Sequence, residues 1–193
     1  KSAKVTMWKD LKQVTIVEGE AGGFYPDLKR YRRTMVWAEG RYILILDELR
    51  AATEVEFTWL VQSGAVESLD EDNQRFKLIK ENSSCEFQIV SEGDYKAEVV
   101  DSKADHRGKP LGWKQLQLKR KAKTWRLVTI FNPWNRNELD VQVEWSNEGA
   151  KLNVKGTDIQ DVLNWEHGEG DDPSAISLRW RNFQFDTHKS ERL

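Results

Sequence analysis

The side chains most often used in catalysis or metal binding are few in this sequence and widely spaced. Three histidines are present, His106, His167 and His188, together with a single cysteine, Cys85. No histidine has a second His or a Cys at the short spacing typical of zinc sites. His106 lies in a polar loop, which predicts a solvated side chain, and we expect the same of His167 and His188. Cys85 lies in an alternating segment, where a free cysteine usually packs in the core. The acidic segment 166–172 offers oxygen ligands for calcium but lacks EF-hand spacing, which favours a solvated turn.

Two basic segments are better candidates for binding anions. Strand alternation within residues 29–33 directs Arg30 and Arg32 to one face and Tyr31 to the other. Guanidinium groups beside an aromatic ring suit the sulfate or uronate groups of a sugar chain. The second segment begins at Lys114 and continues into a run of Lys and Arg. The alternative for each segment is a solvated strand face that is balanced by the abundant Asp and Glu.

Two of the nine tryptophans are candidates for stacking against sugar rings. Trp113 follows a Pro-Leu-Gly segment and Trp134 follows Asn-Pro, so both neighbour loop signals. An exposed indole binds the apolar face of a sugar ring, although core packing is the commoner fate of a Trp in a sandwich. The predicted substrate-binding residues are therefore Arg30, Tyr31, Arg32, Trp113, Lys114 and Trp134.

Length and composition restrict the classes of protein that fit. The chain has 193 residues and a mass of 22.5 kDa, which suits one domain with a sizeable core and argues against two enzyme domains. The 30 Lys and Arg against 32 Asp and Glu give a net charge of −2, which argues against a dedicated nucleic-acid binder. No apolar run approaches the roughly 20 residues that span a membrane. We therefore expect one domain, residues 1–193, with neither a nucleic-acid partner nor a membrane span.

The elements that must position these residues are strands. Apolar residues recur at every second position, as in Val55, Phe57, Trp59 and Val61, and no window has the spacing of an amphipathic helix. The segment 42–46 is apolar throughout, which predicts a central strand covered on both faces. Turn residues separate the segments, which favours an all-β fold, an antiparallel sandwich of about eleven to thirteen strands. The expected strands are 14–18, 32–37, 42–46, 54–62, 74–80, 84–90, 95–100, 114–120, 124–131, 141–145, 151–155 and 175–180.

One long segment resembles a known family. Residues 32–49, Arg-Arg-Thr-Met-Val-Trp-Ala-Glu-Gly-Arg-Tyr-Ile-Leu-Ile-Leu-Asp-Glu-Leu, resemble the β-sandwich region of heparinase II/III-like polysaccharide lyases. In that region an Arg-led strand, a turn, and a strand that starts at Tyr and ends at Asp-Glu form a recurrent hairpin. The likeness continues in order through 54–62, 112–116 and 127–133. It covers about residues 10 to 135 of this chain.

The resemblance implies a role within a larger enzyme. In that family an N-terminal α-helical toroid precedes the sandwich, and the substrate lies in a cleft between them. Family lyases remove the C5 proton of a uronic acid and eliminate the 4-linked sugar, which needs a charge neutraliser for the carboxylate and a Tyr or His as base and acid. Most of these groups come from the helical part. The resemblance thus implies the C-terminal part of a periplasmic or secreted lyase of an acidic polysaccharide, and we expect this chain alone to be inactive.

The resemblance also identifies one candidate metal ligand. Some family members hold a metal with histidines and an Asp, and the positions that match best here are Lys29, Tyr31, Asp47 and Gln62. Only Asp47 keeps a ligand type that zinc commonly uses. The alternatives for Asp47 are capping of a turn or pairing with Arg41. The candidate cofactors are therefore zinc at Asp47 and calcium at the acidic segment.

Three functions are compatible with these observations: the sandwich domain of a polysaccharide lyase, a free-standing carbohydrate-binding module, and a structural or interaction domain with every Trp buried. A contiguous apolar patch on one sheet would favour the first over the second, because a free module exposes no patch beyond roughly a few hundred Å². Salt-sensitive binding to anionic chains that is lost when Arg30 and Arg32 become Ala would favour the first two over the third.

Overall fold

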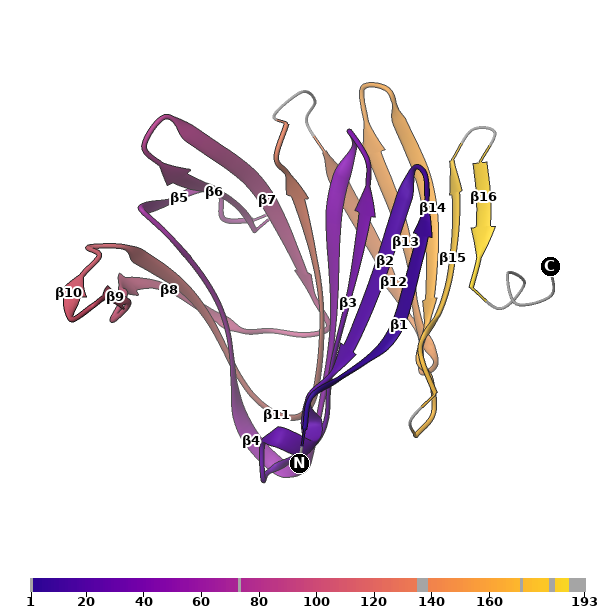
Figure 1. Cartoon of the computed structure of the whole chain (residues 1–193), viewed down its shortest axis with the longest axis horizontal. Helices are drawn as coiled ribbons and strands as arrows, with labels where there is room; N and C mark the ends of the chain where they lie inside the picture. The colour runs from indigo at the N-terminus through magenta and orange to yellow at the C-terminus, as the bar shows by residue number, and fades with distance from the viewer. Residues whose placement is uncertain (1, 73, 135–138, 171, 181–182, 188–193) are drawn as a thin grey trace.

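The structure, a computed structural model, describes residues 2–72, 74–134, 139–170, 172–180 and 183–187 (Figure 1). Nearly all secondary structure in these ranges is β-strand, and the one helical segment is a short 3-10 turn, η1 (Gly22–Phe24). Within the same ranges, no helix is long and apolar enough to cross a membrane. The predicted all-β fold class is confirmed.

The larger of two antiparallel sheets carries most of the chain. Its strands run in the order β1-β2-β3-β4-β11-β7-β6-β5, and β8 also pairs with β11. The bounds are β1 (Lys4–Leu11), β2 (Val14–Glu20), β3 (Leu28–Ala38), β4 (Tyr42–Ser63), β5 (Ala65–Asp70), β6 (Arg75–Lys80), β7 (Ser83–Ser91), β8 (Lys96–Asp101) and β11 (Lys114–Asn132).

The smaller sheet packs against one face of the larger sheet, and a two-stranded hairpin extends from the tip of β8 and β11 (Figure 1). The small sheet consists of β12 (Asp140–Trp145), β13 (Gly149–Gly156), β14 (Ile159–Glu166), β15 (Ala175–Trp180) and β16 (Phe183–Asp186), and the hairpin of β9 (Asp105–His106) and β10 (Lys109–Pro110).

The described residues form more strands than the sequence predicted, and two of the strands are unusually long. The expected strands 42–46 and 54–62 are one 22-residue strand, β4, and 114–120 and 124–131 are likewise one strand, β11. The β4–β11 ladder continues through a bend, with a register shift between Ala122 and Thr124. We call the part beyond the bend the arm; it comprises 55–63, 114–122 and β8.

A first core lies between the two sheets. Ile16, Val36, Leu44 and Ile130 stand opposite one another across β2, β3, β4 and β11, and each is at most 1% exposed. Their partners from the small sheet include Trp165, which is fully buried. Burying large apolar side chains from both inner faces is the main stabilisation of a sandwich.

A second core lies inside the bend, where the arm and β5 to β7 fold over the opposite face of the large sheet. Phe57 and Trp59 of the arm pack there with Trp125, and Phe87 stacks on Phe131 with ring centres 5.2 Å apart. The expectation that 42–46 is covered on both faces is only partly met. Tyr42, Leu44 and Leu46 are fully buried in the first core, but residues 43 and 45 on the other face are half-buried, because the second core covers only part of that face.

Candidate functional site

The basic segment 29–33 forms part of β3, and its side chains alternate between the faces as predicted. Arg30 and Arg32 point towards the small sheet and are 8% and 0% exposed. Arg30 donates from Nη1 to the carbonyl of Gly168 (2.8 Å) and from Nη2 to that of Gly170 (2.9 Å). Both arginines also form ion pairs with buried glutamates. Their guanidinium groups therefore join the two sheets and do not face solvent, where a ligand could reach them.

On the other face of β3, Arg33 forms part of a compact polar cluster. It donates from Nε to Oδ1 of Asp47 (2.7 Å) and from Nη2 to Oδ2 (2.9 Å). The indole Nε1 of Trp59 donates to the same Oδ2 (2.9 Å). The suggested pairing of Asp47 with Arg41 is wrong, because Arg41 instead reaches Asp161 on the small sheet (2.5 Å). Arg41 precedes the first residue of β4, whereas Asp47 lies well along that strand, so extended backbone separates the two side chains.

The residues present do not fit the metal site that the family resemblance implies. Both oxygens of Asp47 already accept hydrogen bonds from Arg33 and Trp59, and the cation beside Asp47 is a guanidinium. Among the described residues, no group of three or more His, Cys, Asp or Glu side chains could hold a metal ion. In the acidic segment, the carbonyls of Gly168 and Gly170 accept from arginines, which also takes oxygen ligands away from a calcium site.

A cavity of about 550 Å³ lies where the arm bends away from β3, and we call it the elbow cavity. One wall is the edge of β4 beyond the bend, which has no partner strand on that side among the described residues. The opposite wall is the segment after η1. The lining residues are Tyr25, Pro26, Asp27, Leu28, Tyr31, Arg33, Leu49, Val55, Glu56, Phe57, Thr58, Trp59, Leu60 and Trp125.

The elbow cavity combines aromatic surface with hydrogen-bonding groups. The rings of Tyr25 and Tyr31 lie 5.9 Å apart, and the guanidinium carbon of Arg33 lies 5.9 Å from the centre of the Tyr31 ring. Tyr25 is 47% exposed, and the Arg33 side chain is 41% exposed. Because Asp47 engages Nε and Nη2 of Arg33, the Nη1 group on the other side of the guanidinium keeps its donors for a ligand. Asp27 adds a carboxylate acceptor.

Burial raises the pKa of Tyr31, and the charge of Asp47 acts in the same direction against the opposing effect of Arg33. The phenol is therefore protonated at neutral pH. It can donate a hydrogen bond to a ligand, but it is a poor base. Two tyrosine rings and a guanidinium together have the chemistry needed to stack against a flat apolar surface and to donate hydrogen bonds to hydroxyl or carboxylate groups.

The other predicted binding residues lie outside the elbow cavity. Trp113 is half-buried at the foot of the β9–β10 hairpin, with Nζ of Lys80 5.0 Å from its ring centre. Lys114 is exposed and pairs with Asp101 (2.5 Å). Trp134 is half-buried just after β11. Of the predicted set, only Tyr31 lines the cavity.

Sequence reasoning missed Tyr25 and Arg33 as site residues. Arg33 was recognised only as part of a basic run, since its link to Asp47 depends on the pairing of β3 with β4. The signal for Tyr25 was the Tyr-Pro-Asp turn before β3, which places an aromatic ring at a loop.

The sequence predictions for the histidines and for Cys85 can be compared with the structure. The expectation that His167 is solvated is wrong: its side chain is 7% exposed, and its Nε2 lies 2.9 Å from Nη1 of Arg126. Cys85 is half-buried, and burial raises the pKa of its thiol to about 11. The predictions for His188 and for the side chain of His106 lie outside the described part of the structure.

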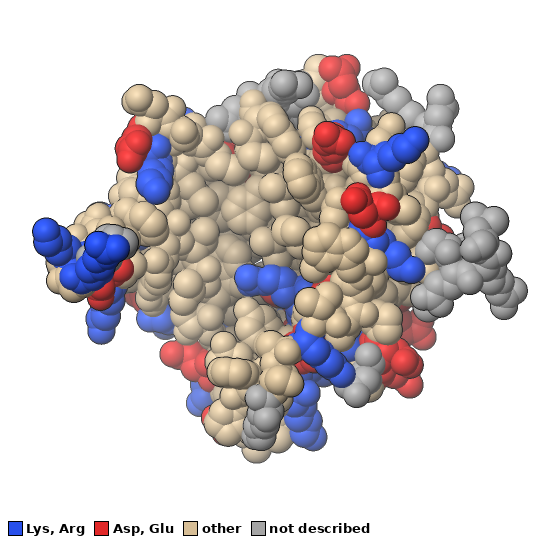
Figure 2. Space-filling view, viewed as in Figure 1, with Lys and Arg blue, Asp and Glu red and all other residues tan. Residues whose placement is uncertain are grey.

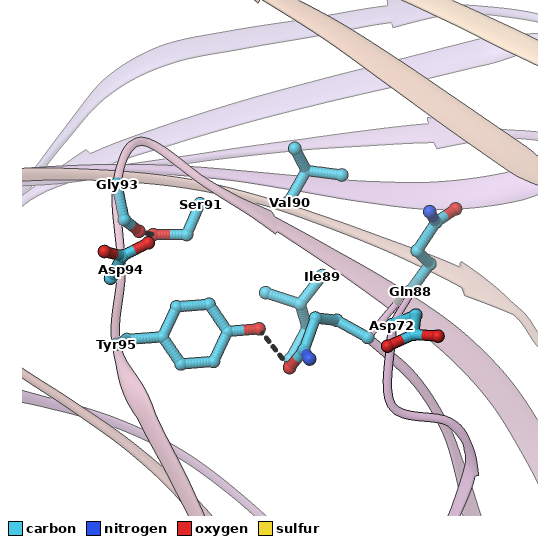
Figure 3. A pocket seen from close by; sticks show the side chains of 9 residues that line it. Asp72, Gln88, Ile89, Val90, Ser91, Gly93, Asp94 and Tyr95 are labelled. Atoms are coloured by element: carbon cyan, nitrogen blue, oxygen red, sulfur yellow. Dashed lines mark hydrogen bonds between the residues drawn. The ribbon is translucent and has the colours of Figure 1, made fainter.

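A second cavity, of about 580 Å³, lies between the end of β7 and the loop before β8 (Figure 3). The Tyr95 ring lies across it and donates from its hydroxyl to Oε1 of Gln74 (2.7 Å), with Asp72 and Asp94 on either side of the ring. It presents carboxylates and no cation. Of these two cavities, only the elbow cavity combines aromatic rings with a cation.

The outer face of the large sheet is apolar across β1 to β4. Trp8, Val17, Met35 and Ile45 stand opposite one another in register, and Trp8 is 66% exposed. Trp37 in the neighbouring row is 44% exposed. Figure 2 shows that charged side chains gather mainly around the rim of the hollow between the arm and the large sheet, whereas its centre is largely uncharged.

Comparisons with known proteins give a match in structure alone. No protein-family model matches the sequence, and no curated protein is significantly similar to it. The structure is similar to a crystal structure of heparinase III, with a TM-score of 0.68 and 14% identity over 86% of this chain and 27% of that chain. It is also similar to heparan sulfate lyase HepC from Pedobacter heparinus, with a TM-score of 0.69 and 14% identity over 87% of this chain and 29% of that chain.

A third solved structure, the heparinase III BT4657 gene product, agrees with these two. Its TM-score is 0.65, with 16% identity over 85% of this chain and 27% of that chain. This chain thus spans less than a third of the length of the structures it matches. The β-sandwich fold predicted from the resemblance is confirmed, and the chain has the fold of one region of the heparinase III structures.

Proposed function

We propose that this chain is the C-terminal sandwich domain of a larger polysaccharide lyase, which binds an acidic, uronate-containing polysaccharide that the whole enzyme cleaves by β-elimination. The fold likeness supports this proposal, since the matched heparinase III structures are several times longer than the matched region. Such an enzyme would act in the periplasm or after secretion.

The observation that carries the proposal is the open apolar face of the large sheet. A free-standing module gains solubility by keeping large aromatic groups off its surface, yet Trp8 and Trp37 are 66% and 44% exposed beside half-buried Met35 and Ile45. The occupant we infer for this face is the remainder of the parent chain, an α-helical toroid that precedes the sandwich. Docking there would cover the face and place the toroid beside the bend that holds the elbow cavity.

The elbow cavity would hold one sugar of the polysaccharide. Tyr25 and Tyr31 offer rings for stacking, and Nη1 of Arg33 offers two donors to a uronate carboxylate. Elimination also needs a base near C5 of the uronate. Tyr31 does not suit that task, because burial raises its pKa and keeps the phenol protonated. We therefore assign binding to this chain and the base to another part of the parent enzyme.

Calorimetric titration with a uronate-containing oligosaccharide tests the assignment of the cavity. We expect Tyr25→Ala and Tyr31→Ala each to weaken binding roughly threefold to tenfold, the range for loss of one aromatic contact. The control is Leu69→Ala, which removes an exposed apolar side chain from β5 that does not line the cavity. Equal affinity of the two tyrosine variants and the control would contradict the assignment.

Two measurements test the role within a larger enzyme. The purified chain is expected to release no unsaturated uronate product from the polysaccharide, as followed by ultraviolet absorbance; steady product formation would contradict this. An immunoblot of source extract is expected to show a band several-fold larger than 22.5 kDa. A band at 22.5 kDa without evidence of processing would contradict the lyase assignment.

The second candidate function is a free-standing carbohydrate-binding module. The elbow cavity favours it, since stacking rings and hydrogen-bonding groups bind sugars without cleaving them. Light scattering distinguishes the two candidates: a free module stays monomeric, whereas an uncovered docking face promotes self-association at high protein concentration.

A further inference from the structure

The β9–β10 hairpin contributes to neither core. Its two strands pair only with each other among the described strands, and residues 107–112 are all exposed (Figure 1). Arg107 and Gly108 have left-handed backbone (φ 53° and 77°), as in the two-residue turns that close hairpins. The backbone N–H of Gly108 also donates to Oδ1 of Asp105 (3.0 Å). The hairpin is therefore a formed, projecting element with no packing role, and such elements often carry binding function.

The same segment concentrates unpaired positive charge. Lys103, Arg107 and Lys109 are exposed, and none of them forms an ion pair with a described carboxylate. Figure 2 shows Lys and Arg side chains gathered at this end of the molecule, where Figure 1 places β9 and β10. Three lysines of the arm, by contrast, are neutralised by acidic neighbours, in the pairs Lys114–Asp101, Lys119–Glu98 and Lys121–Glu54.

A fourth cation lies at the foot of the hairpin. Nζ of Lys80 stands 5.0 Å from the centre of the half-buried Trp113 ring. Because the chain as a whole has a net charge of −2, attraction of a polyanion depends on such a local cluster rather than on the overall charge.

We propose that the hairpin, through Lys103, Arg107 and Lys109, is a second contact for the acidic polysaccharide, outside the elbow cavity. The inference rests on the proposed function and extends it. Carboxylate and sulfate groups accept charge-assisted hydrogen bonds from Lys and Arg. The elbow cavity holds one sugar by shape and stacking, whereas the hairpin anchors a more distant part of the same chain by charge alone.

The salt dependence of binding provides the test. Affinity of the whole chain for a heparan sulfate oligosaccharide is measured over a range of NaCl concentrations, for the wild type and for Lys103→Gln/Arg107→Gln/Lys109→Gln. With about 0.7 counterion released per contact, as for single-stranded polyanions, the slope of log affinity against log salt should become shallower by about two. The control is Lys12→Gln/Lys155→Gln/Arg179→Gln, which removes the same charge from exposed positions away from the arm and should leave the slope unchanged.

The outcomes separate this inference from the proposed function. An unchanged slope in the hairpin variant, with binding still sensitive to Tyr25→Ala, overturns the hairpin contact alone. No binding by the wild type overturns both proposals. Competition by single-stranded DNA as strong as that by the oligosaccharide overturns the commitment to a polysaccharide, since it indicates a contact for polyanions in general.

Discussion

Replacing Trp59 by Ala tests how the second core supports the elbow cavity. Trp59 is 7% exposed in the second core, lines the cavity, and donates from Nε1 to Asp47. The substitution removes a large buried ring and one of the three hydrogen bonds that hold Asp47 and Arg33 in place.

The loss of the buried ring and the loss of the hydrogen bond both lower the free energy of unfolding. Truncation of a buried Trp to Ala costs about 3 to 5 kcal/mol through lost burial and the cavity left behind. The lost hydrogen bond to Asp47 adds about 1 kcal/mol, moderated because Arg33 still satisfies both carboxylate oxygens. We therefore expect a loss of about 4 to 6 kcal/mol for Trp59→Ala and about 1 to 2 kcal/mol for Trp59→Phe, which keeps most of the ring.

Urea denaturation followed by far-ultraviolet circular dichroism measures these losses. The control is Trp37→Ala, since this Trp is 44% exposed on the outer face of the same sheet and should cost less than about 1 kcal/mol. Equal midpoints for Trp59→Ala and Trp37→Ala would refute the reasoning, because they would mean that the inner face of the arm is not a core.

Three further predictions follow from buried groups. Burial lowers the pKa of His167 to about 4, so as the pH falls the unfolded chain binds a proton at this imidazole before the folded chain does. The unfolding free energy should therefore drop by about 2 kcal/mol from pH 7 to pH 5. Urea titrations should show that His167→Gln removes this part of the pH dependence of the unfolding free energy. Asp161→Ala should lower the free energy of unfolding by about 3 kcal/mol, since Asp161 is 1% exposed and accepts hydrogen bonds from Arg41 and Tyr42. An unchanged midpoint of thermal unfolding would mean that this contact between the sheets is dispensable. Alkylation of Cys85 should be slow in the native protein and rapid in urea, because burial raises its pKa to about 11; fast native labelling by mass spectrometry would contradict its half-buried position.

The candidate site could be predicted only in part. Local alternation correctly predicted that Arg30 and Arg32 point to one face of the strand and Tyr31 to the other, because side chains alternate between the two faces along a strand. Alternation does not say which face meets a second sheet. The cationic face was therefore assigned to the ligand, whereas packing of the small sheet buries it and leaves the Tyr31 face open to the elbow cavity.

The sequence by itself determined the all-β class, the antiparallel sandwich and the inward side of the segment with Phe57 and Trp59, because period-two patterning and turn residues act over a few positions. Only the tertiary structure decided that β4 and β11 run unbroken through a bend, that Asp47 meets Arg33 and Trp59, and that His167 is buried beside Arg126. These features depend on register between strands distant in sequence and on which sheet covers which face. The physical reason is that strand pairing and layer packing join residues whose spacing along the chain carries no signal of their contact.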